Sequence, residues 1–205
     1  MRGLIGKKIG MTRVFSTHGQ AIPVTVLEVG PCHITQVKTV KNDGYDAIQL
    51  GFLNLKEKHT TRPLSGHFKK NKVMPAKVLA EFRSIPKFDY KLGQIFNVSL
   101  FSEGDFVSVS GKSKGRGFSG TIKKYSFSTQ RKTHGQGDTH RHVGSIGAAS
   151  DPSRVFPGKK MPGRYGNKTV SVKKLEVISV NESKNQLLVK GSVPGAANGI
   201  VYITR

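Results

Sequence analysis

Runs of β-branched and aromatic residues, separated by turn signals, occur near both ends of the chain. The clearest run, AIPVTVLEV at 21–29, predicts a strand. Less regular alternation predicts further strands at 33–40, 45–50, 94–101 and 106–109. Near the C-terminus, 170–180 and 186–190 flank a polar stretch and so predict a hairpin, and 199–203 predicts a closing strand. Many short strands joined by turns favour a small barrel or a sandwich.

Helical patterns are scarce in the same sequence. Residues 61–72 predict one or two short helical turns. Residues 75–83 fit either a helical turn or a strand, and both interpretations stay open. Asn42-Asp43-Gly44 is a turn signal. The fold class we predict is therefore mainly β.

The middle of the chain has a different composition. Residues 111–168 contain 13 Lys and Arg against 2 acids, a net +11 in 58 residues, and 11 of the 24 glycines. The other 147 residues contain 21 basic and 10 acidic residues, also +11. Such a segment has little core of its own and predicts an irregular, basic extension. Because predicted strands precede and follow it, we expect one discontinuous β body, 1–110 with 169–205, from which 111–168 extends.

Charge and cysteine content limit the class of protein. The net charge of +22 indicates a polyanionic partner, with nucleic acid first and an anionic membrane second. We find no basic amphipathic helix, no run of 18 apolar residues and no signal peptide, so no membrane partner is expected. The single cysteine, Cys32, excludes an internal disulfide and most zinc folds, and it favours a reducing compartment.

A glycine-rich basic loop lies at the start of the predicted extension. The sequence GKSKGRG at 111–117 would let the backbone approach phosphates while Lys112, Lys114 and Arg116 supply charge. It is not a Walker A loop, because Phe106 stands where that motif needs glycine. A solvated loop without a ligand is the alternative, and the sequence does not decide between them.

Three histidines and an aspartate lie close together further along. His134, Asp138, His140 and His142 are of metal-ligating types, but Arg131, Lys132 and Arg141 lie among them and would repel a cation. We therefore favour histidines that contact phosphate or stack on bases, and we expect no metal.

Basic and aromatic residues alternate at the end of the extension. Phe156 and Tyr165 lie among Arg154, Lys159, Lys160, Arg164 and Lys168. This pattern suits irregular RNA, whose bases can be splayed and stacked. Alternatively, the two aromatic side chains attach the extension to itself.

Catalysis finds little support in the sequence. The close acid pairs, Asp43 with Asp46 and Glu103 with Asp105, lie in turn-like sequence, where Asp has structural roles. Cys32 fits packing better than nucleophilic attack. An RNA-processing nuclease and a non-specific DNA-compacting protein remain the alternative functions.

Several ordered motifs resemble one protein family along nearly the whole chain. They are residues 3–15 (GLIGKKIGMTRVF), 42–45 (NDGY), 66–68 (GHF), 113–120 (SKGRGFSG), 133–135 (THG), 144–147 (GSIG), 158–161 (GKKM) and 187–195 (LLVKGSVPG). In this order they resemble the bacterial-type family of large-ribosomal-subunit protein number three.

The resemblance implies a fold, partners and a role. It implies a small β-barrel body of the translation-protein type and a long extension threaded into large-subunit ribosomal RNA (rRNA). It also implies direct binding near the 3′ end of that RNA, nucleation of subunit assembly, and an approach of the extension to the peptidyl-transferase region without chemistry. Large-subunit proteins fourteen and nineteen are implied as neighbours. No cofactor, small-molecule substrate or enzymatic activity is implied.

The predicted binding residues are the cations and histidines of the extension: Lys112, Lys114, Arg116, Lys123, Lys124, Arg131, Lys132, His134, His140, Arg141, His142, Arg154, Lys159, Lys160, Arg164 and Lys168. The predicted tip comprises Gly144, Ser145, Ile146, Gly147, Ala148, Ala149 and Ser150. Many bacterial family members have Gln-Asn-Gln after this Gly-Ser-Ile-Gly, with a methylatable second Gln. Ser150 stands at that position here, so we expect no such modification. The absence of a long tail or leader favours a bacterial or plastid-encoded protein, in the cytoplasm or the plastid stroma.

Overall fold

The structure is a computed structural model that describes residues 3–17, 19–83 and 90–205. Its internal contacts divide the chain into two units, Met1–Ser113 with Thr169–Arg205 (the body) and Lys114–Lys168 (the arm). The predicted extension began at residue 111, but Gly111 and Lys112 pair with other strands of the body. No helix in the described part of the chain has the length and apolarity needed to cross a membrane.

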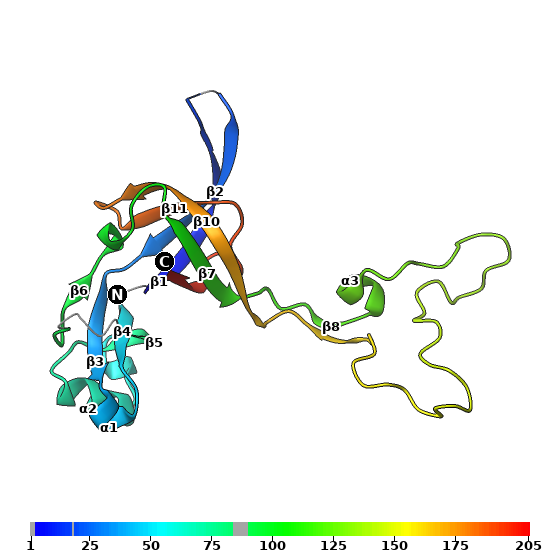
Figure 1. The fold of residues 1–205 in the computed structure, drawn as a ribbon, viewed down its shortest axis with the longest axis horizontal. Helices are drawn as coiled ribbons and strands as arrows, with labels where there is room; N and C mark the ends of the chain where they lie inside the picture. The colour runs from blue at the N-terminus through cyan, green and yellow to red at the C-terminus, as the bar shows by residue number, and fades with distance from the viewer. Residues whose placement is uncertain (1–2, 18, 84–89) are drawn as a thin grey trace. The chain divides into compact units, whose positions relative to one another are not determined.

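The body is built on a closed antiparallel barrel (Figure 1). Around the barrel its strands follow the order β1 (Gly3–Phe15), β12 (Ile200–Thr204), β7 (Phe106–Lys112), β10 (Thr169–Asn181), β11 (Gln186–Lys190) and β2 (Ala21–Val29). The barrel contains β7, which precedes the arm in sequence, and β10, which follows it. These two strands pair from Thr169↔Lys112 to Glu176↔Phe106.

A second sheet belongs to the same body. Its strands are β5 (Ala76–Arg83), β4 (Ala47–Asn54), β3 (Cys32–Lys38) and β6 (Ile95–Phe96), in that order. Its connections include α1 (Val40–Asp43), α2 (Arg62–Lys70) and the 3₁₀ turns η1 (Glu57–His59) and η2 (Val98–Leu100). One hydrophobic cluster contains fully buried side chains from the barrel, such as Leu27, and from this sheet, such as Leu50. The barrel and the sheet therefore share a core.

Most strands predicted from alternation are confirmed. Strand β2 has the predicted bounds, and β10 and β11 form the predicted hairpin. Residues 75–83, left open, form β5 because that segment pairs with β4 along its length. Of the strand predicted at 94–101, Ile95 and Phe96 form β6. The prediction is wrong for the rest, because Val98 to Leu100 form a 3₁₀ turn. The turn predicted at Asn42-Asp43-Gly44 is the end of α1, where Gly44 adopts φ +80.

Strand β1 was not predicted, because glycines interrupt its apolar pattern. A Cβ atom on Gly3 would lie 2.6 Å from the Phe82 ring and 2.7 Å from the Ile203 carbonyl oxygen. Close packing between β1, β5 and β12 therefore requires glycine there. Glycine has a low strand propensity. A glycine that tertiary packing requires, such as Gly3, therefore makes a strand resemble a loop when only the sequence is read.

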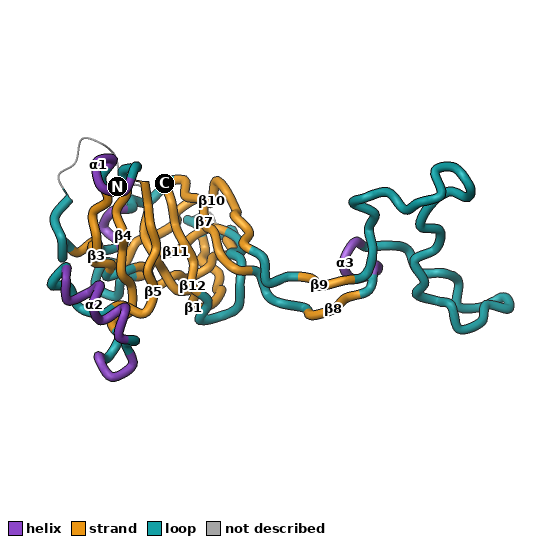
Figure 2. The backbone as a smooth tube through the Cα atoms, turned by 90° about the horizontal axis from the view of Figure 1, so that it is seen from below, coloured by secondary structure: helices purple, strands orange, loops and turns teal. Residues whose placement is uncertain are grey.

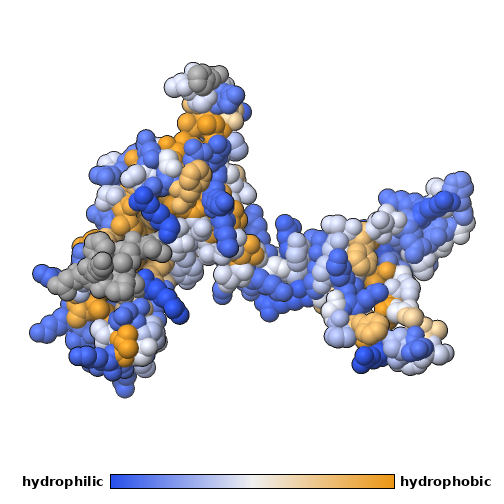
Figure 3. Space-filling model, in the orientation of Figure 1, coloured by the Kyte–Doolittle hydropathy of each residue, from blue (hydrophilic) through white to orange (hydrophobic). Residues whose placement is uncertain are grey.

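The arm contains little regular structure (Figure 2). It has the two-stranded ribbon of β8 (Gly117–Ser119) and β9 (Gly163–Tyr165) and the short helix α3 (Thr121–Tyr125). Its buried side chains are those of Ser119 and Thr121, both polar, whereas every buried hydrophobic side chain described belongs to the body. The visible face of the arm is accordingly mostly hydrophilic, with isolated apolar patches (Figure 3).

Candidate nucleic-acid interface

The ribbon of β8 and β9 brings the two ends of the arm together. The backbone N–H of Arg116 donates to the Tyr165 carbonyl oxygen at 2.9 Å, next to the pair Gly117↔Tyr165. Gly166 follows with φ +73, and a Cβ atom there would collide with the Lys114 carbonyl oxygen. The tight approach of the two chain segments thus depends on glycine at 166.

The predicted binding residues lie on the surface. Lys112 belongs to β7 of the body, Lys123 and Lys124 to α3, and Arg164 to β9. The others lie in loops of the arm. Lys124 and His140 are half-buried; fully on the surface are Lys112, Lys114, Arg116, Lys123, Arg131, Lys132, His134, Arg141, His142, Arg154, Lys159, Lys160, Arg164 and Lys168.

The cations of the arm are largely free of acidic partners. The arm contains 12 Lys and Arg against 2 acids, Asp138 and Asp151, and both acids are exposed. Leaving Lys168 aside, none of the arm's basic side chains forms an ion pair with a described residue. Their positive charge is therefore available to an external anion.

The body uses some of its charges internally. Lys38 pairs with Glu81 at 2.8 Å, and Arg205 pairs with Asp105 at 3.0 Å. Tyr45 completes the first cluster, because its hydroxyl contacts Lys38 at 2.9 Å and Glu81 at 2.8 Å. Hydrogen bonds from Lys38 and Tyr45 lower the pKa of Glu81, and hydrogen bonds to Glu81 and Tyr45 raise the pKa of Lys38.

The histidine cluster does not gather into a metal site. His140 Nδ1 lies 3.1 Å from the Arg131 carbonyl oxygen, and the backbone N–H of Gln130 donates to the His140 carbonyl oxygen at 3.1 Å. Within the described residues, no three His, Cys, Asp or Glu side chains are placed to hold a metal ion. His140 links two segments of its loop, while His134 and His142 face solvent.

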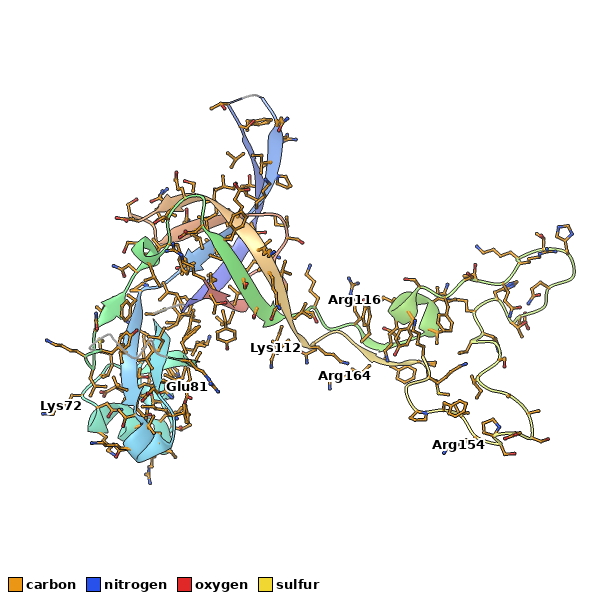
Figure 4. All side chains as sticks on the ribbon, in the orientation of Figure 1. Lys72, Glu81, Lys112, Arg116, Arg154 and Arg164 are labelled. Atoms are coloured by element: carbon orange, nitrogen blue, oxygen red, sulfur yellow. The ribbon has the colours of Figure 1, made fainter. Side chains whose placement is uncertain are left out.

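The two aromatic residues considered above, Phe156 and Tyr165, are both exposed, Tyr165 at 39%, whereas Tyr125 of α3, which was not considered, is half-buried. The ammonium groups of Lys124 and Lys160 lie 5.1 and 5.8 Å from the Tyr125 ring centre, so Tyr125 connects α3 to a distant segment. The Phe156 ring is 58% exposed, and the Arg154 guanidinium, labelled in Figure 4, lies 5.5 Å from it. Phe156 therefore retains accessible ring surface, whereas Tyr125 helps attach the arm to itself.

The predicted tip, 144–150, is exposed at every residue. Ser145 Oγ donates to the Gly147 carbonyl oxygen at 2.9 Å, and the Ser153 hydroxyl donates to the Ser150 carbonyl oxygen. A shallow pocket of about 460 Å³ lies between the tip and residues 153–155. The tip thus presents backbone and small side chains to its surroundings.

Sequence reasoning missed two features of the surface. Residues 56–72, which include α2, contain six Lys and Arg against one acid, Glu57. A window count of charge would have found this segment. The other feature is Phe118 of β8, whose side chain is 81% exposed. Nothing in the surrounding sequence predicts that exposure.

The acidic pairs and the cysteine have structural roles, as predicted. Asp46 accepts a hydrogen bond from the Val40 N–H at 3.1 Å, and Asp105 accepts one from the Ser102 N–H at 2.9 Å. Cys32 is fully buried, and burial raises the pKa of its thiol to about 11. The thiol is therefore neutral at physiological pH and unsuited to nucleophilic attack.

The chain is similar to known proteins along nearly its whole length. Residues 87–187 match the family model described as ribosomal protein L3. The chain is 50% identical over 203 residues to large ribosomal subunit protein uL3 of Petrotoga mobilis, covering 99% of this chain and 94% of that protein. It is 48% identical to uL3c of Phaeodactylum tricornutum, covering 98% and 97%, and 48% identical to uL3 of Thermotoga petrophila, covering 99% and 96%. By these matches, the chain belongs to the ribosomal protein L3 (uL3) family.

Proposed function

We propose that this chain is a structural constituent of the large ribosomal subunit and that its arm binds rRNA. The relatives are named as large ribosomal subunit proteins, and the family is structural rather than enzymatic. They include bacterial proteins and a plastid-type uL3c. A place on the ribosome of a bacterium or a plastid follows from that membership.

The observation that carries the RNA-binding role is the unpaired charge of the arm. Leaving Lys168 aside, eleven basic residues of this 55-residue unit form no ion pair with a described residue, and the unit buries no apolar side chain. A segment that cannot bury apolar surface gains order mainly from its partner, and phosphates would supply the missing counter-charges. We expect the arm to be mobile free in solution and ordered on rRNA.

The finer role follows from the family resemblance. We infer that the protein binds large-subunit rRNA near its 3′ end, helps to nucleate assembly, and directs the tip, 144–150, toward the peptidyl-transferase region. We infer large-subunit proteins fourteen and nineteen as neighbours. Ser150 carries no amide, so the tip would pack on RNA without side-chain methylation.

Sedimentation in high salt tests the proposal. Tagged protein is expressed in cells, and large subunits are pelleted through about 0.5 M and about 1 M monovalent salt, conditions that screen exposed charge pairs. We expect the protein to remain at a constant ratio to other large-subunit proteins. Complete release into the supernatant would contradict a role as an integral constituent.

Competition binding separates the alternative functions. Purified protein is bound to labelled large-subunit rRNA, and unlabelled duplex DNA of equal phosphate concentration is added as competitor at the same salt concentration. We expect a strong preference for rRNA; equal competition would favour a DNA-compacting protein. Intact rRNA after incubation with Mg²⁺ is expected, whereas metal-dependent cleavage abolished by Asp138→Asn would favour a nuclease.

A further inference from the structure

Phe118 is the most exposed large hydrophobic side chain in the described chain. Its exposed fraction is 81%, whereas Met74, next in rank, reaches 66%. Single apolar side chains are common on protein surfaces, so exposure alone assigns no role. The surroundings of Phe118 distinguish it.

The ribbon holds Phe118 in a defined position. Phe118 lies directly opposite Arg164, and residues opposite each other in an antiparallel pair project from the same face. Its neighbour Ser119 is buried at 4% exposure, and Thr121 just beyond is 1% exposed. Because successive side chains in a strand alternate, Ser119 faces the interior of the arm and Phe118 faces solvent.

Two guanidinium groups belong to the same ribbon. Arg164 comes from β9, and Arg116 precedes β8, where its backbone N–H is bonded to Tyr165. Both side chains are exposed, and Figure 4 labels both on the ribbon. The exposed phenyl ring thus belongs to a residue paired with Arg164 and lying two positions after Arg116, and each guanidinium is able to bind phosphate in a bidentate manner.

Among the described residues, none stacks on the ring of Phe118. Tyr125 and Phe156 each lie near a cation of the arm, and Tyr125 also contacts Phe127, whereas no described side chain stacks on Phe118. An exposed aromatic face with arginines nearby along the ribbon is the chemistry that recognises an unpaired nucleobase between two phosphates.

We propose that Phe118 is a stacking platform for one unpaired rRNA base, with Arg116 and Arg164 binding the phosphates that flank it. This inference rests on the proposed rRNA binding and adds a defined subsite to it. Alternatively, a hydrophobic pocket of a neighbouring protein would receive the Phe118 ring, but the two arginines close to Phe118 along the ribbon favour RNA.

Ring chemistry at position 118 provides the first test. Phe118→Ala and Phe118→Leu should each weaken binding to large-subunit rRNA by about 5- to 100-fold, the range expected for one lost stacking contact. Phe118→Trp should bind at least as tightly as the parent chain. The matched control is Phe106→Ala in β7 of the body, 64% exposed, which should not change the affinity.

Salt dependence separates the ring from the arginines. Phe118→Ala should leave the slope of log affinity against log salt unchanged, since a phenyl group displaces no counterion. Arg164→Gln should reduce that slope by about one. Unchanged affinity in both Phe118→Ala and Phe118→Leu would overturn the proposal. Full affinity in Phe118→Leu alone would also overturn it, because leucine packs but does not stack.

A fluorescence measurement observes the contact directly. The chain contains no tryptophan, so Phe118→Trp introduces a single indole, which can be excited selectively over the 5 tyrosines. Stacking on a base should quench its emission when rRNA is added, and Phe106→Trp should keep its emission. Binding without quenching would overturn the stacking role, whereas a parent chain that does not bind rRNA would instead contradict the proposed function.

Discussion

The body and the arm show two ways in which one chain can acquire a defined shape. The body has a net charge of +12 in 150 residues and a hydrophobic cluster that joins its barrel to its second sheet. The arm has +10 in 55 residues, and its buried side chains are only Ser119 and Thr121. The body therefore has a core that can order it, whereas the arm has none, and under the proposed function it gains its order from the phosphates of rRNA.

Removal of the arm should have the largest effect. Lys112 and Thr169 are register partners, so replacing 113–168 by Asn-Gly would join β7 and β10 as a tight hairpin. We expect a folded body with cooperative thermal unfolding and an rRNA affinity lower by about two orders of magnitude or more. Circular dichroism melting and filter binding measure the two effects. Loss of cooperative unfolding would show that the body needs the arm.

The same substitution in the two regions should have unequal effects on stability. Phe52 is 1% exposed in the core, and Phe156 is 58% exposed in the arm. Phe52→Ala should lower the free energy of unfolding by about 3–5 kcal/mol, and Phe156→Ala should change it by less than about 0.5 kcal/mol. Urea denaturation followed by circular dichroism measures both. Similar losses would contradict the assignment of all cooperative stability to the body.

A smaller effect concerns acid stability of the body. The pKa of Glu81 is lowered from its usual 4.5, so its stabilising contribution is present above about pH 4.5 and is lost as pH falls through the lowered value. Glu81→Gln should therefore lower the melting temperature slightly at pH 7 and flatten its decline below pH 4.5. Lys38 behaves oppositely, since its raised pKa keeps its contribution until pH rises well above 10.5. The matched control is Glu182→Gln, an exposed acid in the turn after β10, where no flattening is expected.

The sequence predicted those parts of the fold that local alternation determines. Strand β2 and the hairpin of β10 and β11 have β-branched residues at regular intervals, and both form as predicted. Strand β1 escaped prediction because Gly3 is required by Phe82 and Ile203, residues far away in sequence. The segment after Gln94 pairs with β3 only at Ile95 and Phe96, because Val98 to Leu100 then form a 3₁₀ turn.

The candidate site was predictable in its charge but not in its geometry. Counting Lys and Arg located the arm, because charge density is a property of composition. Phe118 escaped notice because its exposure depends on which face of the ribbon is buried, and only the structure shows that this is the face of Ser119. Lys112 was assigned to the extension because its pairing with Thr169 cannot be read from local sequence.

The salt dependence of rRNA affinity tests the central claim most directly. Three arm cations, Arg131, Lys132 and Arg141, are changed together to Gln, and three body lysines, Lys173, Lys174 and Lys184, are changed together as an equal-charge control. The account predicts that the arm set reduces the slope of log affinity against log salt by about two to three, while the body set changes it by less than about one. Equal slope changes in the two sets would show that net charge alone, rather than the arm, binds the RNA.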